Sequence, residues 1–493
     1  MFFYPDPERF RERDARLLAL DFNTFPSASR ALIDLLARAV EPSSGSGLLV
    51  QVDSSYKPFL GKTYFGRWGR IRSSLVASLG FEYLFINKRD FCSDFPIKKV
   101  TEELLDIFQS AHDYSDIKKI KFNGGSIGYS VISTMATILG ESEFTIHTRK
   151  KLLPRLIRHY TESYFLTKAL IESHKIQGLL VFNGRFINEN AAVAAAKNAG
   201  ITVIYYERPR PETYIASCHS PHSITGFALE LEESLKTTSR EEVQITAKEW
   251  YEKRFNRLDP EIMQFQSGWS KTWPINLDDK EKNLISIFPT SDDEFFGISQ
   301  DWDLPGNATQ RDWVLDFAVK ATSAGNSVVI RLHPNLLTKS KRLIKSWSSL
   351  EKIPGVHLIM PESPVDSYRL IKTSDLVVTC GSTIAMEAGY LGAPVLSIGS
   401  GIYDYLHAVK KITDPNQWDL ILKNKDFHEL KANIAACENY AFFEKKREIE
   451  RLYDFEEYPG KISSLPNLFI RVVSYIYRYS QQKQKGFTLW MNH

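Results

Sequence analysis

The sequence is poor in cysteine and has no long apolar run. Its four cysteines lie far apart among 493 residues and show no Cys/His metal spacing, which argues against a disulfide scaffold or a zinc module and for free thiols in a reducing compartment. No stretch reaches ~18 consecutive apolar residues, so we expect no membrane-spanning helix. The first residues are charged too early for a signal peptide. These features predict a cytoplasmic protein.

Neither charge sign is in excess. Lys and Arg number 62 against 59 Asp and Glu, which argues against nucleic acid as a partner across the surface. The chain is 43% hydrophobic and 25% charged, with 12% aromatic residues, as in ordinary globular proteins. At about 150 residues per domain, two large or three smaller domains are expected.

Short apolar runs alternate with helical patterns, which is typical of strand–helix–strand units with parallel sheets. The alanine-rich segment 187–200 is expected to form a helix that ends at Gly200, and the segment 122–134 is expected to be a glycine loop that opens another helix. The expected strands are 17–22, 48–53, 178–183 and 201–206 in the first half, and 284–289, 327–334, 356–360, 375–379 and 394–398 in the second.

These elements predict two consecutive Rossmann-like domains that face a cleft, where ligands bind at the carboxyl ends of parallel strands. The expected boundaries are 1–238 for the first domain, 239–280 for a helical linker, 281–440 for the second domain and 441–493 for C-terminal helices with a basic-aromatic tail.

The strongest motif runs from Ser374 to Gly399 and places Gly381 between a buried strand and a helix. Ser382 or Thr383 can cap that helix, whose N–H groups and dipole would attract a phosphate. Glu387, one turn further, can accept hydrogen bonds from ribose hydroxyls. The alternative is a simple cap followed by a solvated acid.

A second motif, Arg331 to Asn335, ends an apolar strand. Alternation puts Arg331 and His333 on one face, and Pro334 stops the strand where a ligand would sit. A guanidinium and a protonated imidazole can hold phosphate oxygens and assist a phosphate leaving group. The alternative is a structural ion pair of Arg331 and a His333 satisfied by backbone.

A third motif, Phe288 to Gly297, follows the first strand of the second half. Ser291 can donate to phosphate or sugar hydroxyls, and Asp293 and Glu294 can bind a sugar, a cation or an arginine. A solvated acidic loop is the alternative. A metal would need more oxygen ligands than the motif offers, so none is expected.

These three motifs, in this order, resemble the GT-B glycosyltransferases of bacterial capsule and lipopolysaccharide synthesis, including Kdo-transferase-like capsule polysaccharide biosynthesis proteins. The resemblance covers 284–401 and extends more weakly to 179–207. It implies a GT-B fold whose second domain holds a nucleotide-sugar as co-substrate, without a further cofactor.

For single residues, the resemblance places Arg331, His333 and the Ser382-Thr383 pair at the donor phosphate and Glu387 at the ribose. It favours a CMP-activated acidic sugar, such as Kdo or a nonulosonic acid, over a UDP- or GDP-sugar.

Polar residues also end strands in the first half. Asn183 and Arg185 can hold an acidic sugar or an acceptor hydroxyl. Glu207 is our candidate general base, or nucleophile if configuration is retained, with Asp53 as the second choice. The alternative for Glu207 is an ion pair with Arg208 or Arg210. His219 and His222 we interpret as incidental loop residues.

Two basic segments remain. The stretch from Lys57 to Arg72 can receive an acidic acceptor or be a solvated surface, and the tail beyond 441 can pack across the first domain or rest on an anionic membrane. We therefore expect a glycosyltransferase that extends an oligosaccharide or lipid-linked glycan in the cytoplasm, with peripheral membrane contact left open. The alternatives are a UDP-sugar 2-epimerase-like isomerase and a non-catalytic nucleotide-sugar- or glycan-binding subunit.

Overall fold

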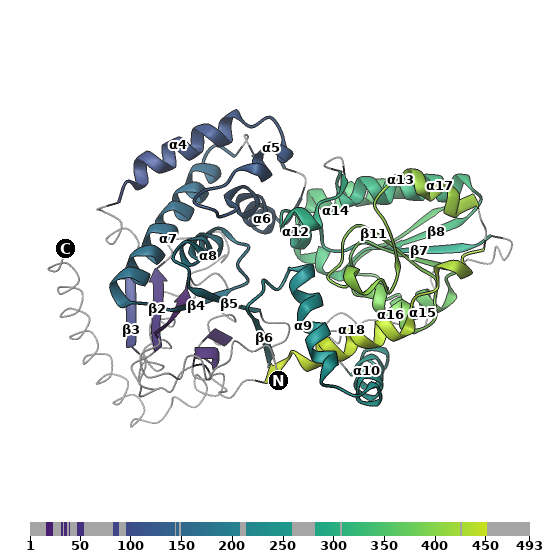
Figure 1. Ribbon diagram of the computed structural model, residues 1–493. Helices are drawn as coiled ribbons and strands as arrows, with labels where there is room; N and C mark the ends of the chain where they lie inside the picture. The colour runs from purple at the N-terminus through teal and green to yellow at the C-terminus, as the bar shows by residue number, and fades with distance from the viewer. Residues whose placement is uncertain are drawn as a thin grey trace, which may run out of the picture.

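The computed structural model contains two sheets, one mainly and one fully parallel, each flanked by helices (Figure 1). It describes residues 16–22, 31–32, 34–36, 39, 47–53, 82–87, 95–142, 144–146, 149–207, 213–258, 282–305, 308–423 and 426–450. The basic segment from Lys57 to Arg72 and the tail from 451 onward lie outside these residues, as do Arg208 and Arg210.

The first sheet has seven strands in the order β13-β6-β5-β4-β1-β2-β3. Strands β1 to β5 are parallel, whereas β6 and β13 join one edge in antiparallel pairing. From β3 to β6 this is the 3-2-1-4-5-6 order of a Rossmann fold. The strands are β1 (Leu17–Asp21), β2 (Gly47–Asp53), β3 (Glu82–Asn87), β4 (Gly178–Phe182), β5 (Thr202–Glu207), β6 (Thr213–Ser217) and β13 (Ile449–Glu450).

The helices of this domain bury apolar faces against the sheet and one another. The expected alanine-rich helix is α8, and its small side chains let it pack closely against α7. Gly200 follows it with a φ of 69°, as expected for a helix end. The helices are α4 (Ile97–Ser110), α5 (Tyr114–Lys119), α6 (Ile127–Leu139), α7 (Leu152–His174) and α8 (Ile187–Asn198).

The second sheet is fully parallel, in the order β12-β11-β10-β7-β8-β9. It repeats the 3-2-1-4-5-6 order, so the prediction of two Rossmann-like domains is confirmed. All nine expected strands form, whereas β3, β6, β12 and β13 were not anticipated from the sequence. The strands are β7 (Leu284–Phe288), β8 (Ser327–Arg331), β9 (Val356–Ile359), β10 (Leu376–Thr379), β11 (Val395–Ile398) and β12 (Lys410–Ile412).

Helices cover both faces of this sheet. The longer ones are α9 (Ile224–Lys236), α10 (Arg240–Phe255), α13 (Gln310–Ser323), α14 (Lys341–Ser348), α17 (Asn416–Lys423) and α18 (Ile434–Lys446); the shorter ones are α12 (Asp292–Phe295), α15 (Ser367–Thr373) and α16 (Ile384–Tyr390), with 3-10 turns η3 (Gln300–Trp302), η5 (Pro334–Thr338), η6 (Ser349–Lys352), η7 (Asp404–Leu406) and η8 (His428–Leu430).

The segment that we expected to link the domains begins with α10. Trp250 and Tyr251 of α10 are buried, and the helix packs against α18 in the core of the second domain (Figure 1). After α18 the chain returns to the first sheet through β13. Residues 259–280 of the expected linker lie outside the described part.

The two domains touch beside their cleft, where α6 packs against α12 (Figure 1). Gly297 is needed there, since its φ is 75° and a Cβ would lie 2.5 Å from Cγ2 of Ile132. The Ser340 hydroxyl also donates to Glu141 at 3.1 Å. Over the described ranges, no helix has the length and apolarity to cross a bilayer.

Candidate functional site

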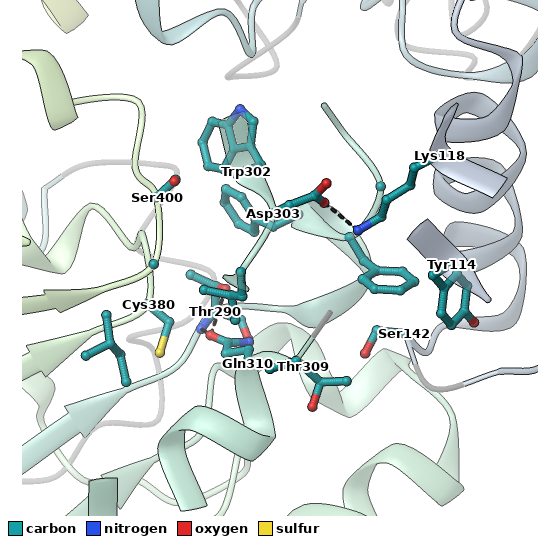
Figure 2. Close-up of a pocket in the computed structure, with 17 residues that line it drawn as sticks. Tyr114, Lys118, Ser142, Thr290, Trp302, Asp303, Thr309, Gln310, Cys380 and Ser400 are labelled. Carbon is teal, nitrogen blue, oxygen red and sulfur yellow. Dashed lines mark hydrogen bonds and ion pairs between the residues drawn. The ribbon is translucent and has the colours of Figure 1, made fainter. Parts of the chain in front are cut away.

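A pocket lies between the domains at the carboxyl edge of the second sheet (Figure 2). Thr290, Cys380 and Gly399 line it just after β7, β10 and β11, and Tyr114 and Lys118 line it from the first domain. Strands β7 and β10 are the first and fourth of the Rossmann order, so the pocket occupies the topological switch point, where such sheets bind ligands.

The loop after β10 is shaped by Gly381. Its φ is 75°, and a Cβ would lie 2.1 Å from the carbonyl oxygen of Ser400, so only glycine lets the two loops meet. The Ser382 hydroxyl accepts the Ile384 N–H at 3.3 Å, whereas Thr383 is exposed and makes no capping bond. Helix α16 has only seven residues, so hydroxyls and backbone N–H groups, more than a helix dipole, are what this loop offers a phosphate.

Glu387 is buried and bonded to protein partners, which does not agree with the expected ribose contact. Its side chain is 2% exposed. One carboxylate oxygen lies 3.0 Å from Nη1 of Arg254, and the other accepts the Tyr368 hydroxyl at 2.7 Å. The reason is tertiary: α10 and α15 pack over α16 and bring both partners. Glu387 of α16 therefore links α10 and α15 to its own helix.

Arg331 is likewise bonded within the protein, although not through the ion pair that we gave as the alternative. Its Nη1 donates to the carbonyl of Met360, and its Nη2 to that of Ser363 at 3.1 Å. Burial lowers the pKa of Arg331 to about 10. The guanidinium thereby orders the loop after β9, and its partners in the structure are backbone carbonyls.

His333 is the N-cap of η5, and its Nδ1 accepts the Asn335 N–H at 3.1 Å. Burial, with the nearby charges of Arg331 and Lys339, lowers the pKa of His333 to about 4. This pKa favours the neutral imidazole at pH 7, in contrast to the charged histidine that we expected at the phosphate.

The acidic loop is paired and not merely solvated. Asp293 accepts the Ser291 hydroxyl at 2.8 Å and lies 2.6 Å from Nζ of Lys339. Glu294 accepts Nδ2 of Asn335 at 3.2 Å, and burial raises the pKa of its carboxyl group. The second and third motifs thus form one polar cluster.

The first domain contributes the residues after β4. The Arg185 side chain crosses to the second domain and donates from Nη1 to the carbonyl of Glu294. Asn183 adopts a φ of 53°, which asparagine tolerates, and donates from Nδ2 to Glu207. Asn183 and Arg185 therefore lie close to Glu207, the candidate base, opposite the acidic loop.

Asp53, the second choice of base, ends β2, which β1 separates from β4; its side chain lies outside the described part. His222, which we had interpreted as incidental, has its Nε2 3.0 Å from Nδ2 of Asn183. Burial, with the charges of Arg185 and Arg447, lowers the pKa of His222 to about 3. His222 thus contacts a predicted site residue, which its interpretation as an incidental loop residue did not anticipate.

Sequence reasoning also missed the pocket's inter-domain contacts. Asp303 lies 2.6 Å from Nζ of Lys118 and accepts the Tyr129 hydroxyl at 2.7 Å (Figure 2 shows the Lys118 contact). These partners of Asp303 lie 185 and 174 residues away in the sequence, so no local sequence pattern predicts the contacts. One sequence feature could have indicated the pocket: Gly399-Ser400-Gly401 is a second glycine–serine turn directly after a strand. Over the described ranges, no three His, Cys, Asp or Glu side chains are grouped as metal ligands.

No protein-family model and no curated protein matches the chain. Among solved structures, it is similar to the Thermosulfurimonas dismutans KpsC beta-Kdo 2,7-transferase, with 16% identity, coverage of 61% of this chain and 87% of that one, and a TM-score of 0.35. It is also similar to the Neisseria meningitidis UDP-GlcNAc 2-epimerase bound to UDP-GlcNAc. The identity is 12%, the match covers 87% of this chain and 97% of that one, and the TM-score is 0.32.

A third similar structure is the Burkholderia multivorans alpha,alpha-trehalose 6-phosphate synthase (11% identity, 87% and 95% coverage, TM-score 0.32). Transferases and epimerases thus both occur among these distant neighbours. The strand orders of the chain itself carry the fold assignment: two Rossmann-like domains around a cleft, in the GT-B arrangement.

Proposed function

We propose that this chain is a glycosyltransferase that moves a sugar from a nucleotide-sugar to a glycan hydroxyl. The observation that carries the proposal is the meeting of Asn183, Arg185 and Glu207 of one domain with the Ser291–Glu294 loop of the other. Polar groups from both carboxyl edges converge beside a switch-point pocket, as a reaction between two bound substrates requires.

The donor half of the proposal uses the pocket in the second domain. The nucleotide phosphates would lie against the Gly381–Thr383 and Gly399–Gly401 loops, whose N–H and hydroxyl groups can stabilise the departing phosphate. His333 and Asn335 would position the donor sugar as neutral hydrogen-bonding groups. We assign no phosphate contact to Arg331 and no ribose contact to Glu387.

The acceptor half of the proposal uses Glu207. The acceptor oxygen would bond to the anomeric carbon while the bond from that carbon to the phosphate oxygen breaks. Glu207 would take the hydroxyl proton, and the nucleotide would leave with the electron pair. Arg185, between Glu207 and Glu294, would hold the carboxylate of an acidic sugar.

The more specific proposal is a CMP-activated acidic sugar, such as Kdo, transferred to a growing bacterial surface polysaccharide on the cytoplasmic side. It comes from the resemblance of the motifs at Arg331–Asn335 and Gly381–Thr383. The acceptor would be an oligosaccharide or a lipid-linked glycan, with peripheral membrane contact through the tail.

A thermal-shift panel of CMP, UDP, GDP, CMP-Kdo, UDP-GlcNAc and GDP-mannose tests the donor, because a ligand that binds only the native state raises the melting temperature. We expect selective stabilisation by CMP or CMP-Kdo. Selective UDP or UDP-GlcNAc stabilisation would contradict the CMP assignment, and no stabilisation at all would contradict the donor pocket.

Glu207→Gln tests the chemistry. We expect unchanged donor binding and a loss of sugar transfer of at least about 10²-fold, the contribution of a positioned general base. Glu233→Gln, in an exposed ion pair on α9, is the control and should transfer normally. Wild-type transfer by Glu207→Gln would show that Glu207 is not the general base, and Asp53 would be the next candidate.

A UDP-sugar 2-epimerase is the second candidate. The observation that favours it is the gathering of acids and histidines, Glu207, His222, Asp293, Glu294 and His333, around one cleft. An epimerase would convert UDP-GlcNAc into its C2 stereoisomer without an acceptor, whereas a transferase would release nucleotide. Nucleotide binding without either reaction would instead indicate a binding subunit.

A further inference from the structure

The side-chain amide of Asn183 is held at both of its ends. Its Nδ2 carries two hydrogens: one goes to Glu207, and the other points at Nε2 of His222, 3.0 Å away. Its Oδ1 accepts the backbone N–H of Arg185 at 3.4 Å. The residue is 3% exposed, so water cannot readily replace these partners.

His222 must accept the bond from Asn183, because an amide nitrogen only donates. Its Nε2 is therefore unprotonated, and the proton sits on Nδ1. His222, together with Glu207 and the Arg185 N–H, therefore fixes which way the Asn183 amide points. With the amide reversed, Oδ1 would face the Glu207 carboxylate and repel it.

His222 is fixed in turn by the opposite domain. The indole N–H of Trp302 donates to the His222 carbonyl at 2.8 Å, and the two rings meet edge to face with centroids 6.4 Å apart. Trp302 lies next to Asp303, which Lys118 and Tyr129 bind from the first domain. Trp302 and Asp303 also line the donor pocket.

We propose that His222 is a positioning residue that acts through Asn183 to orient the Glu207 carboxylate, and that Trp302 of the second domain supports this alignment through its bond to His222. The inference rests on the proposed role of Glu207 as the base. It explains how a donor bound beside Trp302 readies a carboxylate on the other side of the cleft.

The test compares His222→Leu, which cannot accept from Asn183, with His222→Gln, whose amide oxygen can. The control is His219→Leu, because His219 belongs to the same loop but pairs with Glu230 at 2.9 Å. The measurement is nucleotide release from CMP-Kdo and UDP-GlcNAc with water as the acceptor, together with the affinity for each donor.

We expect His222→Leu to lower kcat about tenfold, part of the 10²–10⁴-fold that a positioned base supplies, with little change in donor affinity. His222→Gln should recover most of the rate, and His219→Leu should behave as wild type. Equal rates for His222→Leu and wild type, or equal losses in His222→Leu and His222→Gln, would overturn the proposal.

Trp302→Phe keeps the ring and removes the N–H, so it should lower kcat in the same direction. Adding Trp302→Phe to His222→Leu should lower kcat little further, because both substitutions act through the Glu207 carboxylate. Fully additive losses would contradict the shared route.

Glu207→Gln separates this inference from the proposed function. If Glu207→Gln turns over normally, the base assignment fails. If only Glu207→Gln is impaired and His222→Leu is not, the positioning role alone fails. Crystal structures of His222→Leu and His222→Gln decide the matter without turnover: an unmoved Asn183 amide and Glu207 carboxylate in His222→Leu would overturn the proposal.

Discussion

Lys118 and Asp303 form an ion pair across the two domains, with Nζ 2.6 Å from Oδ1. The Lys118 side chain is 9% exposed and also lies 5.8 Å from the ring centroid of Phe296. A pair shielded from water is screened less by salt than a surface pair. This contact holds α5 against the η3 segment on one wall of the pocket.

Lys118→Met keeps the length of the side chain and removes its charge. We expect it to favour an open cleft and to weaken binding of the stabilising nucleotide about tenfold, within the usual range of domain coupling. Calorimetry would measure the affinity, and solution scattering the radius of gyration. Lys119→Met, which removes an exposed ion pair with Asp116 on the same helix, should change neither.

Glu387→Ala should destabilise the second domain by about 3–5 kcal/mol, because it leaves Arg254 buried without its carboxylate partner. Chemical denaturation would measure the loss. Arg254→Met combined with Glu387→Ala should recover part of it, since both charges are then gone. A stable Glu387→Ala protein with weaker nucleotide binding would restore the ribose contact that we have withdrawn.

The pKa of His333 predicts how stability depends on pH. It lies at about 4 in the folded protein and near 6.5 in an unfolded chain, so its contribution is complete above pH 6.5. Between pH 6.5 and 4 the unfolded state binds the extra proton, and stability falls by about 1.4 kcal/mol per pH unit. His333→Asn, which can still accept the Asn335 N–H, should show a shallower fall in urea unfolding. The same pH dependence of the free energy of unfolding in wild type and His333→Asn would contradict the lowered pKa of His333.

Gly381→Ala should disturb the pocket, because the new methyl group would lie 2.1 Å from the Ser400 carbonyl. Gly392→Ala is the matched control: its φ is 80°, and a Cβ there meets nothing within 4 Å. Both variants pay the strain of a left-handed backbone, about 1–3 kcal/mol. Nucleotide affinity should fall only in Gly381→Ala. Equal affinities in Gly381→Ala and Gly392→Ala would show that the Gly381 turn does not contact the nucleotide.

Much of the fold could be predicted because its signals are local. Mainly apolar runs such as Leu284–Phe288 mark buried parallel strands, and Gly200 marks the end of α8. The strands not anticipated have weaker local patterns: β12 carries two lysines, and β13 has only two residues. Their place depends on pairing with a neighbour.

The sequence by itself determined two α/β halves and the strand ends where polar residues gather, because apolar periodicity and glycine or proline breaks are properties of neighbouring residues. Only the tertiary structure decided which of those polar residues face the cleft. Arg331 and Glu387 carry the charges that a ligand site needs, yet packing turned them toward Met360 and Tyr368. His222 carried no local signal and lies beside Asn183, because a buried polar group takes whatever partner the folded chain brings to it.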